Sequence, residues 1–453
     1  MVADGHASPV IATGQGFAAL IALGALGLAM TAFVAAGPWL IRTHGYGVFI
    51  PCMAASGLVT IAATTLASAV PVRLGLFVVL AFAIAMRLLL IAEEPFLSTD
   101  IYRYIWDGRV QGAGINPFAH VPADEALKAL RDAEIYPRIN RADYAVTAYP
   151  PVAQMFFLGV TRISETLVAM RLATVSCEIV IIAVIIDLLG RLQLPAAAVV
   201  AWAWHPLAIW EIANNGHVDA LMVALLMLGV WLLVGNRALA GAVAMALAAL
   251  VKPYVVVALP AFWRPWDWRV PLAVAATVAL CYLPYLGAGA GVLGFVTSGY
   301  LAEEGFASGE GLWLVALARL ALGDVPGLTA AYVLVAVGVV GWLCLRTVSR
   351  SGATPKETLG DVAVLLMAGL FFLSPNYSWY VLAVVPFIAL GGGAPAWTMT
   401  LAAILLYRPL TLPDNDIAWK TLANLPFVIA AASAILLHGR KVAATQRASP
   451  WTR

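Results

Sequence analysis

The sequence has little charge and few cysteines. Only 11% of its 453 residues are Asp, Glu, Lys or Arg, whereas soluble globular proteins carry about 25%. The four cysteines lie in apolar surroundings without the spacing of metal ligands, so neither disulfides nor a zinc site is predicted. The net charge of +2 indicates no particular partner, and nucleic acid is not expected. We find no internal repeat, and the glycine-rich stretches do not resemble a loop that cradles nucleotide phosphates.

Hydrophobic residues are what the chain has in excess. They make up 62% of it, and the mean hydropathy is +0.91. Apolar runs recur near the roughly 20 residues that cross a bilayer as a helix. The predicted fold class is therefore all-α, a polytopic integral membrane protein with about 11–14 transmembrane helices. We expect these spans near 15–37, 50–69, 73–92, 168–189, 196–213, 218–235, 238–251, 270–286, 327–345, 360–373, 379–391, 397–412 and 422–437.

Lys and Arg cluster around 346–356 and in the tail at 440–453. Clustered positive charge favours the cytoplasm, so we predict both segments there. If the short apolar piece 151–163 does not cross, the polar segments share the extracytoplasmic face: 94–149, 214–219, 287–312, 374–379 and 413–420. The predicted parts are N-terminal membrane helices (1–93), a partly helical extracytoplasmic loop after the third span (94–150), a membrane core with polar, broken helices (151–286), a second extracytoplasmic loop (287–312), and C-terminal membrane helices with a cytoplasmic tail (313–453).

The segment 94–149 holds more than a quarter of the chain's charged residues in about an eighth of its length. A plain connector between spans has no need of such a segment. If 100–109 is helical, one face carries residues at i, i+3, i+4 and i+7, namely Asp100, Arg103, Tyr104 and Asp107. A second face, which suits a sugar ring or a phosphate, carries Tyr102, Trp106 and Arg109. The structural alternative is that Thr99 or Asp100 only caps the helix while Asp107 pairs with Arg103.

Ionisable residues also interrupt the apolar region 205–219. Such groups are expensive at membrane depth and are therefore functional candidates. His217 and Asp219 either orient a substrate hydroxyl or help to hold the first loop. The alternative is that Asn214, Asn215 and Asp219 cap helix ends in the interface. For Glu211 the two interpretations have equal weight.

Three further polar sites follow. Lys252-Pro253 breaks an apolar run, and its ammonium group needs an anionic partner; a lipid phosphate would supply one, and snorkelling to the interface is the alternative. The aromatic turn 374–380 either lines a site or belongs to an interfacial belt. Arg408 next to Pro409 is a further phosphate candidate.

These segments resemble the GT-C superfamily of polytopic glycosyltransferases that use polyprenyl-phosphate sugars. The likeness is strongest to the bacterial polyprenol-phosphomannose-dependent α-mannosyltransferases. It rests on STDIYRYIWDGRVQGAGINPF at 98–118, YPPVAQ at 149–154, HPLAIWEIANNGHVDALM at 205–222, LVKPY at 250–254 and SPNYSWYVLAVVP at 374–386. In the family the catalytic aspartate lies in the first large extracytoplasmic loop, which corresponds to Asp100. Several members begin that loop after the first span, whereas here it follows the third. The family often has His-Pro-Trp-Tyr where this chain has 376–380, so a contact of that histidine is not carried over.

The resemblance implies a glycosyltransferase of a bacterial inner membrane that is active on the extracytoplasmic face. It would move a sugar to a hydroxyl of a lipid or glycan acceptor, and the resemblance suggests that this sugar is mannose. Asp100 would act as general base in an inverting single displacement, with Arg103 and Lys252 as phosphate partners. Asp107, His217 and Asp219 would position substrate, and Tyr104 and Trp106 would supply stacking surface. The remaining substrate-binding candidates are Arg109, Asn116, Tyr149, Asn215, Tyr377, Trp379 and Arg408. The expected partners are membrane lipids, the polyprenyl-phosphate donor and the acceptor. No cofactor is expected; Asp100 and Asp107 could hold a divalent metal, but Arg103 on the same face argues against it.

Two other function classes remain open. A transporter or lipid flippase would also have broken helices and buried charge. It would not need the polar segment 94–149, and an internal repeat would be expected. An O-antigen-type polymerase or ligase would carry its charged outer loop late in the chain, where 287–312 holds only Glu303, Glu304 and Glu310.

Overall fold

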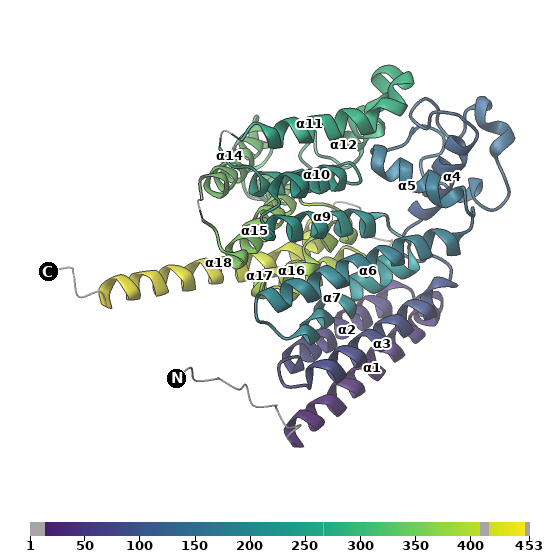
Figure 1. Ribbon diagram of the computed structural model, residues 1–453. Coiled ribbons are helices and arrows are strands. Elements are labelled where there is room, and N and C mark those ends of the chain that lie inside the picture. Colours follow the sequence, from purple (N-terminus) through teal and green to yellow (C-terminus); the bar gives the residue numbers. More distant parts are fainter. Residues whose placement is uncertain (1–13, 266, 351, 408–415, 449–453) are drawn as a thin grey trace.

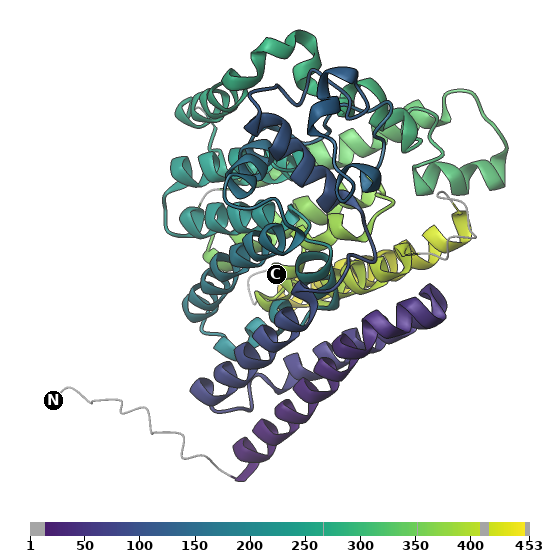
Figure 2. The ribbon, with the colours of Figure 1, turned by 90° about the vertical axis from the view of Figure 1, so that its right-hand side faces the viewer.

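A computed structural model describes residues 14–265, 267–350, 352–407 and 416–448. Over these residues the chain is built from helices joined by short turns, with no strand, and this confirms the predicted all-α fold class. The long helices run roughly side by side, and the first loop region, with α4 and α5, lies at one end of the bundle (Figure 1). Seen from that end, the loop region covers the ends of several long helices (Figure 2).

The first three helices form the N-terminal part of the bundle. They are α1 (Gly14–His44), α2 (Tyr46–Leu66) and α3 (Val72–Ile91), and α1 packs against both of the others. Gly45 separates α1 from α2 with a φ of 63°, a left-handed conformation that glycine adopts without steric cost. The three bounds match the spans expected near 15–37, 50–69 and 73–92.

The polar loop region follows α3. Its helices are α4 (Asp100–Gly112), the 3₁₀ helices η1 (Glu125–Leu130) and η2 (Tyr136–Arg138), and α5 (Pro151–Thr161), which packs on α4. Pro151 takes the first position of α5, where its missing N–H group costs no intrahelical hydrogen bond. α5 has 11 residues and is too short to cross a membrane unaided.

A bent pair of helical segments lies in the centre of the chain. The first part comprises η3 (Ala196–Val199) and α7 (Val200–Ala203), and the second α8 (Pro206–Ala208) and the π-helix η4 (Ile209–Asn214). The axis of the second part is bent by 59° from that of the first. His205, which precedes Pro206, has an extended backbone with ψ of 127°, because proline disfavours the helical conformation in the residue before it. The turn that follows η4, near Asn215 and Gly216, lies against the loop region.

The remaining helices complete the bundle. They are α6 (Leu167–Arg191), α9 (Asp219–Val234), α10 (Ala238–Ala249), η5 (Pro253–Phe262), α11 (Arg269–Tyr282), η6 (Leu283–Leu293), η7 (Val296–Tyr300), α12 (Leu301–Glu303), α13 (Trp313–Leu322), α14 (Leu328–Ser349), α15 (Pro355–Leu373), η8 (Ser378–Ala383), α16 (Val385–Ala389), α17 (Gly393–Ala402), η9 (Ala403–Leu406) and α18 (Ile417–Ala448). α9 packs between α6 and α10. α15 begins with a capping box between Thr354 and Glu357, a motif that satisfies free N–H groups at a helix start.

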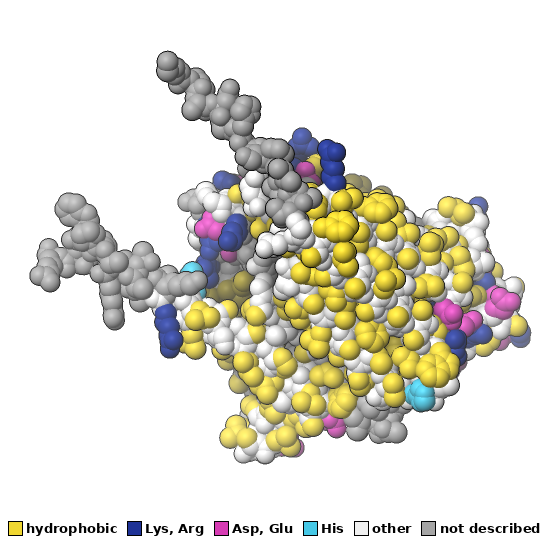
Figure 3. All heavy atoms as spheres, turned by 90° about the horizontal axis from the view of Figure 1, so that it is seen from below, with side chains coloured by type: hydrophobic (Ala, Val, Ile, Leu, Met, Phe, Trp, Pro, Cys, Tyr) yellow, Lys and Arg dark blue, Asp and Glu magenta, His cyan; other side chains and the backbone are white. Residues whose placement is uncertain are grey.

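Seven helical segments of the described chain are long and apolar enough to cross a membrane, or eight if the bent pair is one span. The expected 11–14 crossings exceed this number. Most of the difference lies in apolar helices of 10–17 residues, such as α9, α10 and α17 with its continuation η9, which are shorter than the roughly 20 residues that a spanning helix needs. The span expected near 360–373 is the 19-residue α15, which carries Lys356, Glu357 and Asp361 and is not among the seven. Figure 3 shows a face covered largely by hydrophobic side chains, with charged side chains toward its edges. The protein is therefore an integral membrane protein.

Candidate active site

A cavity of about 840 Å³ opens where the loop region meets the bundle. Its lining comes from segments far apart in the chain: 95–100, 140–150, 251–254, 296–306 and 373–380, with Tyr46 beside them. All of these segments except 251–254 belong to stretches that were predicted to lie on one polar face. Their convergence around a single cavity makes it the candidate active site.

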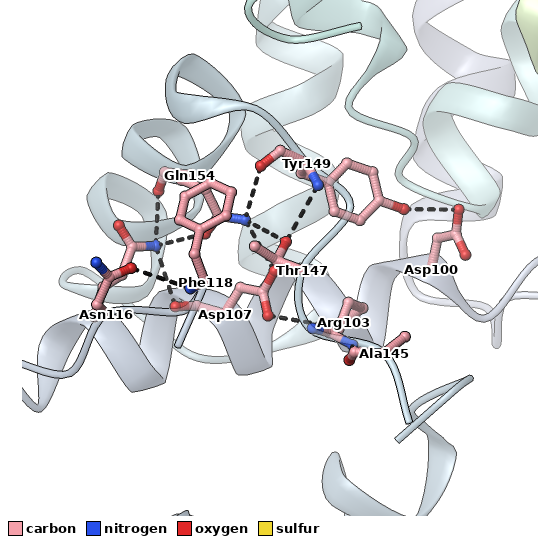
Figure 4. Close-up of polar contacts among 10 residues, drawn as sticks. Asp100, Arg103, Asp107, Asn116, Phe118, Ala145, Thr147, Tyr149 and Gln154 are labelled. Carbon is pink, nitrogen blue, oxygen red and sulfur yellow. Dashed lines mark hydrogen bonds and ion pairs between the residues drawn. The ribbon is translucent and has the colours of Figure 1, made fainter. Parts of the chain in front are cut away.

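Asp100 begins α4 and is half-buried, facing the cavity. Asn140 Nδ2 donates to its Oδ1 over 2.7 Å. The Tyr149 hydroxyl donates to its Oδ2 over 3.0 Å (Figure 4). Burial acts to raise the pKa of the Asp100 carboxyl, but His217, Lys252 and these two hydrogen bonds outweigh it, so the pKa lies below its usual value. Burial raises the pKa of the Tyr149 phenol well above its usual value, so the phenol stays neutral and keeps its donor proton.

The segment leading into Asp100 is held by two asparagines at the end of the bent helix pair. Asn214 receives a hydrogen bond from the Phe96 amide and donates to the Glu94 carbonyl, at 3.1 and 2.9 Å. Asn215 receives one from the Leu97 amide at 3.2 Å. The expected alternatives for Asn215 were substrate contact or capping of a helix end. The structure instead has its side chain on the backbone that precedes α4, and it does not line the cavity.

Gly216 provides the close approach that this arrangement needs. Its φ is 67°, and a Cβ atom at this position would lie 2.6 Å from Cδ1 of Ile101 in α4. A residue with a side chain would have to adopt an unfavourable backbone and displace the Ile101 side chain. The glycine thus permits the close approach of the 205–219 turn to the helix that carries Asp100.

Lys252 also lines the cavity. Its Nζ lies 3.3 Å from Oδ2 of the fully buried Asp219 at the start of α9. The ammonium group also lies over the rings of Tyr149 and Tyr380, 5.3 and 5.7 Å from their centroids, which attract a cation. Lys252 was predicted to need an anionic partner, and Asp219 of the protein itself is such a partner.

A buried polar cluster lies beneath the cavity. His217 Nδ1 is 3.3 Å from the Tyr104 hydroxyl and 3.8 Å from Oδ2 of Asp219, and its Nε2 is 3.3 Å from Oε2 of Glu211. Tyr104, Glu211, His217 and Asp219 are each completely buried. Of the two sequence interpretations for His217 and Asp219, this geometry favours positioning of neighbouring groups over direct contact with a substrate.

An aromatic stack joins this cluster to the cavity wall. Trp379 is sandwiched between the rings of His217 and Tyr377, with centroid distances of 4.4 and 4.5 Å. Both faces of Trp379 are occupied, whereas Tyr377 ends the stack and lines the cavity, where a sugar ring can approach it. The turn 374–380 lines the cavity, as one of its two sequence interpretations proposed.

The second half of the predicted α4 face packs into the protein. Arg103 Nε donates to Oδ1 of Asp107 over 2.7 Å, and Gln154 Nε2 donates to the other oxygen of Asp107 over 2.9 Å (Figure 4). Arg103 also donates to the Ala145 carbonyl, and both ends of the pair are buried. Neither residue lines the cavity. The pairing of Asp107 with Arg103 that the structural alternative predicted is present, so these residues do not enter the mechanism proposed below.

Four other substrate-binding candidates also lie outside the cavity lining. Tyr104 stacks on Phe157 at 4.5 Å, and Trp106 is buried beside Tyr136. Arg109 forms ion pairs with Asp132 and Glu165.

The fourth of these candidates, Asn116, donates to the Tyr285 carbonyl. Arg408 lies outside the described residues. Thus Asp100, Tyr149, Lys252, Tyr377 and Trp379 are the predicted site residues that the cavity brings together.

Sequence analysis missed Asn140 and Arg141, which both line the cavity. Their segment has no helical periodicity that could have aligned them with Asp100, so no local signal marks them. Asp100 and Asp107, the pair considered for a metal, have different partners. In the described part of the chain, no group of three or more His, Cys, Asp or Glu side chains gathers as metal ligands do.

Comparison with known proteins places the chain in a family. The model of the MptA_B family, alpha-(1->6)-mannopyranosyltransferase, N-terminal domain, matches residues 11–267, which is more than half of the chain. The match includes Asp100, Tyr149 and Lys252, whereas the lining segments 296–306 and 373–380 lie beyond it. Searches of curated proteins and of solved structures return no match. The chain belongs to the alpha-(1->6)-mannopyranosyltransferase family and is a glycosyltransferase of the membrane, a mannosyltransferase.

Proposed function

We propose that this mannosyltransferase takes mannose from a polyprenyl-phosphate donor and transfers it to a hydroxyl of a lipid-linked or glycan acceptor, with Asp100 as general base. One observation carries the proposal: the Asp100 carboxylate and the Lys252 ammonium group line the same cavity. A base and a cation are the two groups that transfer from a phosphate-linked sugar requires.

The reaction is a single displacement at the anomeric carbon. The acceptor oxygen forms a bond to that carbon while the bond to the phosphate oxygen breaks, and its electron pair leaves with the phosphate. The acceptor proton passes to Asp100, which its lowered pKa keeps ionised at neutral pH. Because one displacement inverts the anomeric centre, a β-linked donor gives an α-linked product. The α-(1→6) linkage in the family's description supports this outcome, and we propose the 6-hydroxyl of a mannose unit as acceptor.

Asn140 and Tyr149 aim the base. Both donate to Asp100, one to each carboxylate oxygen, so the carboxylate cannot rotate without losing a hydrogen bond. The remaining lone pairs are available to the acceptor hydroxyl from the cavity side. Two donors also weaken the base, which suits a reaction in which the leaving group is already activated by its phosphate.

Lys252 is the proposed partner of the donor phosphate. Its contact with Asp219 holds the ammonium group in place, and a cation fixed in advance stabilises the charge that develops on the leaving phosphate. Tyr377 offers a ring in the cavity wall at which a sugar can stack. We propose that the cavity opens to the extracytoplasmic side of a bacterial inner membrane, in agreement with the charge bias of the loops.

The test uses the purified full-length protein in nanodiscs with β-linked polyprenyl-phosphate mannose and an α-mannoside acceptor. We expect wild type to transfer mannose with inversion. Asp100→Asn should retain donor binding and lose transfer by about 10²–10⁴-fold, the contribution of a positioned general base. The matched control is Asp143→Asn, which removes an exposed carboxylate of the same loop and should leave transfer unchanged.

Full activity in Asp100→Asn would remove the assigned base. Movement of the lipid-linked sugar across the bilayer without mannose transfer would favour the transporter class instead. A retained anomeric configuration would exclude single displacement.

A further inference from the structure

The cavity holds a second cation that sequence analysis did not select. Among the described lining residues, the basic side chains are Lys252 and Arg141. They differ in their partners. Asp219, which pairs with Lys252, is fully buried at the start of α9, so its carboxylate is fixed beside the ammonium group. The partner of Arg141 lies at the surface of the cavity.

Arg141 binds Glu303 through a fork. Its Nε and Nη2 both lie 2.6 Å from Oε1 of Glu303. Glu303 ends the three-residue helix α12, and its side chain is 34% exposed. Because the pair is partly exposed, solvent screens it, and a competing anion can reach the guanidinium group.

The residue after Glu303 is anchored separately. Glu304 is buried and accepts a hydrogen bond from Asn376 Nδ2 over 2.7 Å. It lies 3.7 Å from Arg141 Nη2, beyond the length of a good hydrogen bond. Release of Glu303 therefore does not require the segment to leave the cavity wall.

The backbone of Arg141 is held in an unfavourable conformation. Its φ is 56°, in the left-handed region that residues with a Cβ atom rarely adopt and that occurs at functional sites. The neighbouring Asn140 donates to Asp100. The left-handed turn therefore directs the Asn140 side chain to the base while the Arg141 side chain lines the cavity. An anion bound by Arg141 would thus lie in the same cavity as the base.

We propose that Arg141 is a second phosphate-binding group of the cavity, and that Glu303 occupies its guanidinium group until a phosphate replaces it. This inference rests on the proposed function, since the phosphate is that of the lipid-linked donor. The planar guanidinium fork matches two phosphate oxygens as it matches a carboxylate. Donor binding then breaks the contact between the first loop and α12, and departure of the lipid phosphate allows Glu303 to return.

The test measures binding of farnesyl phosphate to the full-length protein in phosphatidylcholine nanodiscs. Arg141→Gln should weaken binding by about tenfold or more, the effect of a lost charge-assisted hydrogen bond. Glu303→Gln should tighten it by up to about fivefold, because the competitor is gone. In the double variant the tightening should vanish. Arg138→Gln is the matched control, since Arg138 pairs with Glu94 outside the cavity and should leave binding unchanged.

Inorganic phosphate serves as a second probe. If it binds with the same dependence on both residues, Arg141 recognises phosphate alone; if only farnesyl phosphate does, the lipid chain is part of the ligand. Both results support the competition. Unchanged affinity in Glu303→Gln, or equal tightening in the double variant, overturns it, and this holds even if Arg141→Gln fails to fold. If wild type transfers mannose but the binding of farnesyl phosphate does not depend on Arg141, this inference is refuted and the proposed function is not. Arg141-dependent binding without any transfer refutes the proposed function instead.

Discussion

The buried pair of Lys252 and Asp219 allows its structural and chemical roles to be separated. The two side chains lie 3.3 Å apart, and Asp219 is fully buried. Lys252→Met leaves an uncompensated carboxylate, and Asp219→Asn leaves an uncompensated ammonium group. Breaking a buried pair from one side costs about 3–5 kcal/mol, whereas removing both charges is often close to neutral. We predict that each single variant is destabilised by that amount and that the double variant is nearly as stable as wild type.

Activity should not follow stability. If Lys252 holds the donor phosphate, the double variant folds well but still lacks the cation, so its mannose transfer stays low. Thermal unfolding of the four proteins in one detergent, followed by tryptophan fluorescence, gives the stability cycle, and transfer below the unfolding range gives the activity. Wild-type transfer in the stable double variant would show that Lys252 has only a structural role. Wild-type stability in both single variants would show that the pair is not desolvated as described.

Three further predictions follow from the same geometry. Because the pKa of Asp100 is lowered, transfer should fall only in acid solution below the usual pKa of an aspartate; an acidic limb near neutrality in the kcat/KM profile would contradict Asp100 as the base. Asp107→Asn removes the partner of the buried Arg103 and should destabilise the protein by about 3–5 kcal/mol, measured by thermal unfolding, while the donor affinity of the folded protein stays unchanged. EDTA should leave mannose transfer unchanged, since Asp100 bonds to an amide and a phenol; loss of activity restored by Mg²⁺ or Mn²⁺ would refute this.

Much of the membrane architecture was predictable because it depends on local composition. The helices α1, α2, α3 and α6 lie where apolar runs predicted spans, since a long apolar segment has few alternatives to a helix in a bilayer. The crossing number was less predictable. Apolar segments of 10–17 residues have the composition of a span without its length, so hydropathy alone does not tell whether they cross.

The sequence by itself determined the fold class and the polar loop after the third apolar run. It offered a helix over 100–109 as a condition, and the structure shows that α4 begins at Asp100. Periodicity correctly indicated that Arg103 and Asp107 lie together, but it could not tell whether that face meets a cavity or the protein interior. Only the tertiary structure decided this: Gln154 in α5 covers Asp107, while the start of α4 remains open to the cavity. It also brought Asn140, Arg141 and Glu303 to the site. Such contacts join segments up to 162 residues apart, and a pairing over that distance depends on the packing of the whole bundle, which no local pattern records.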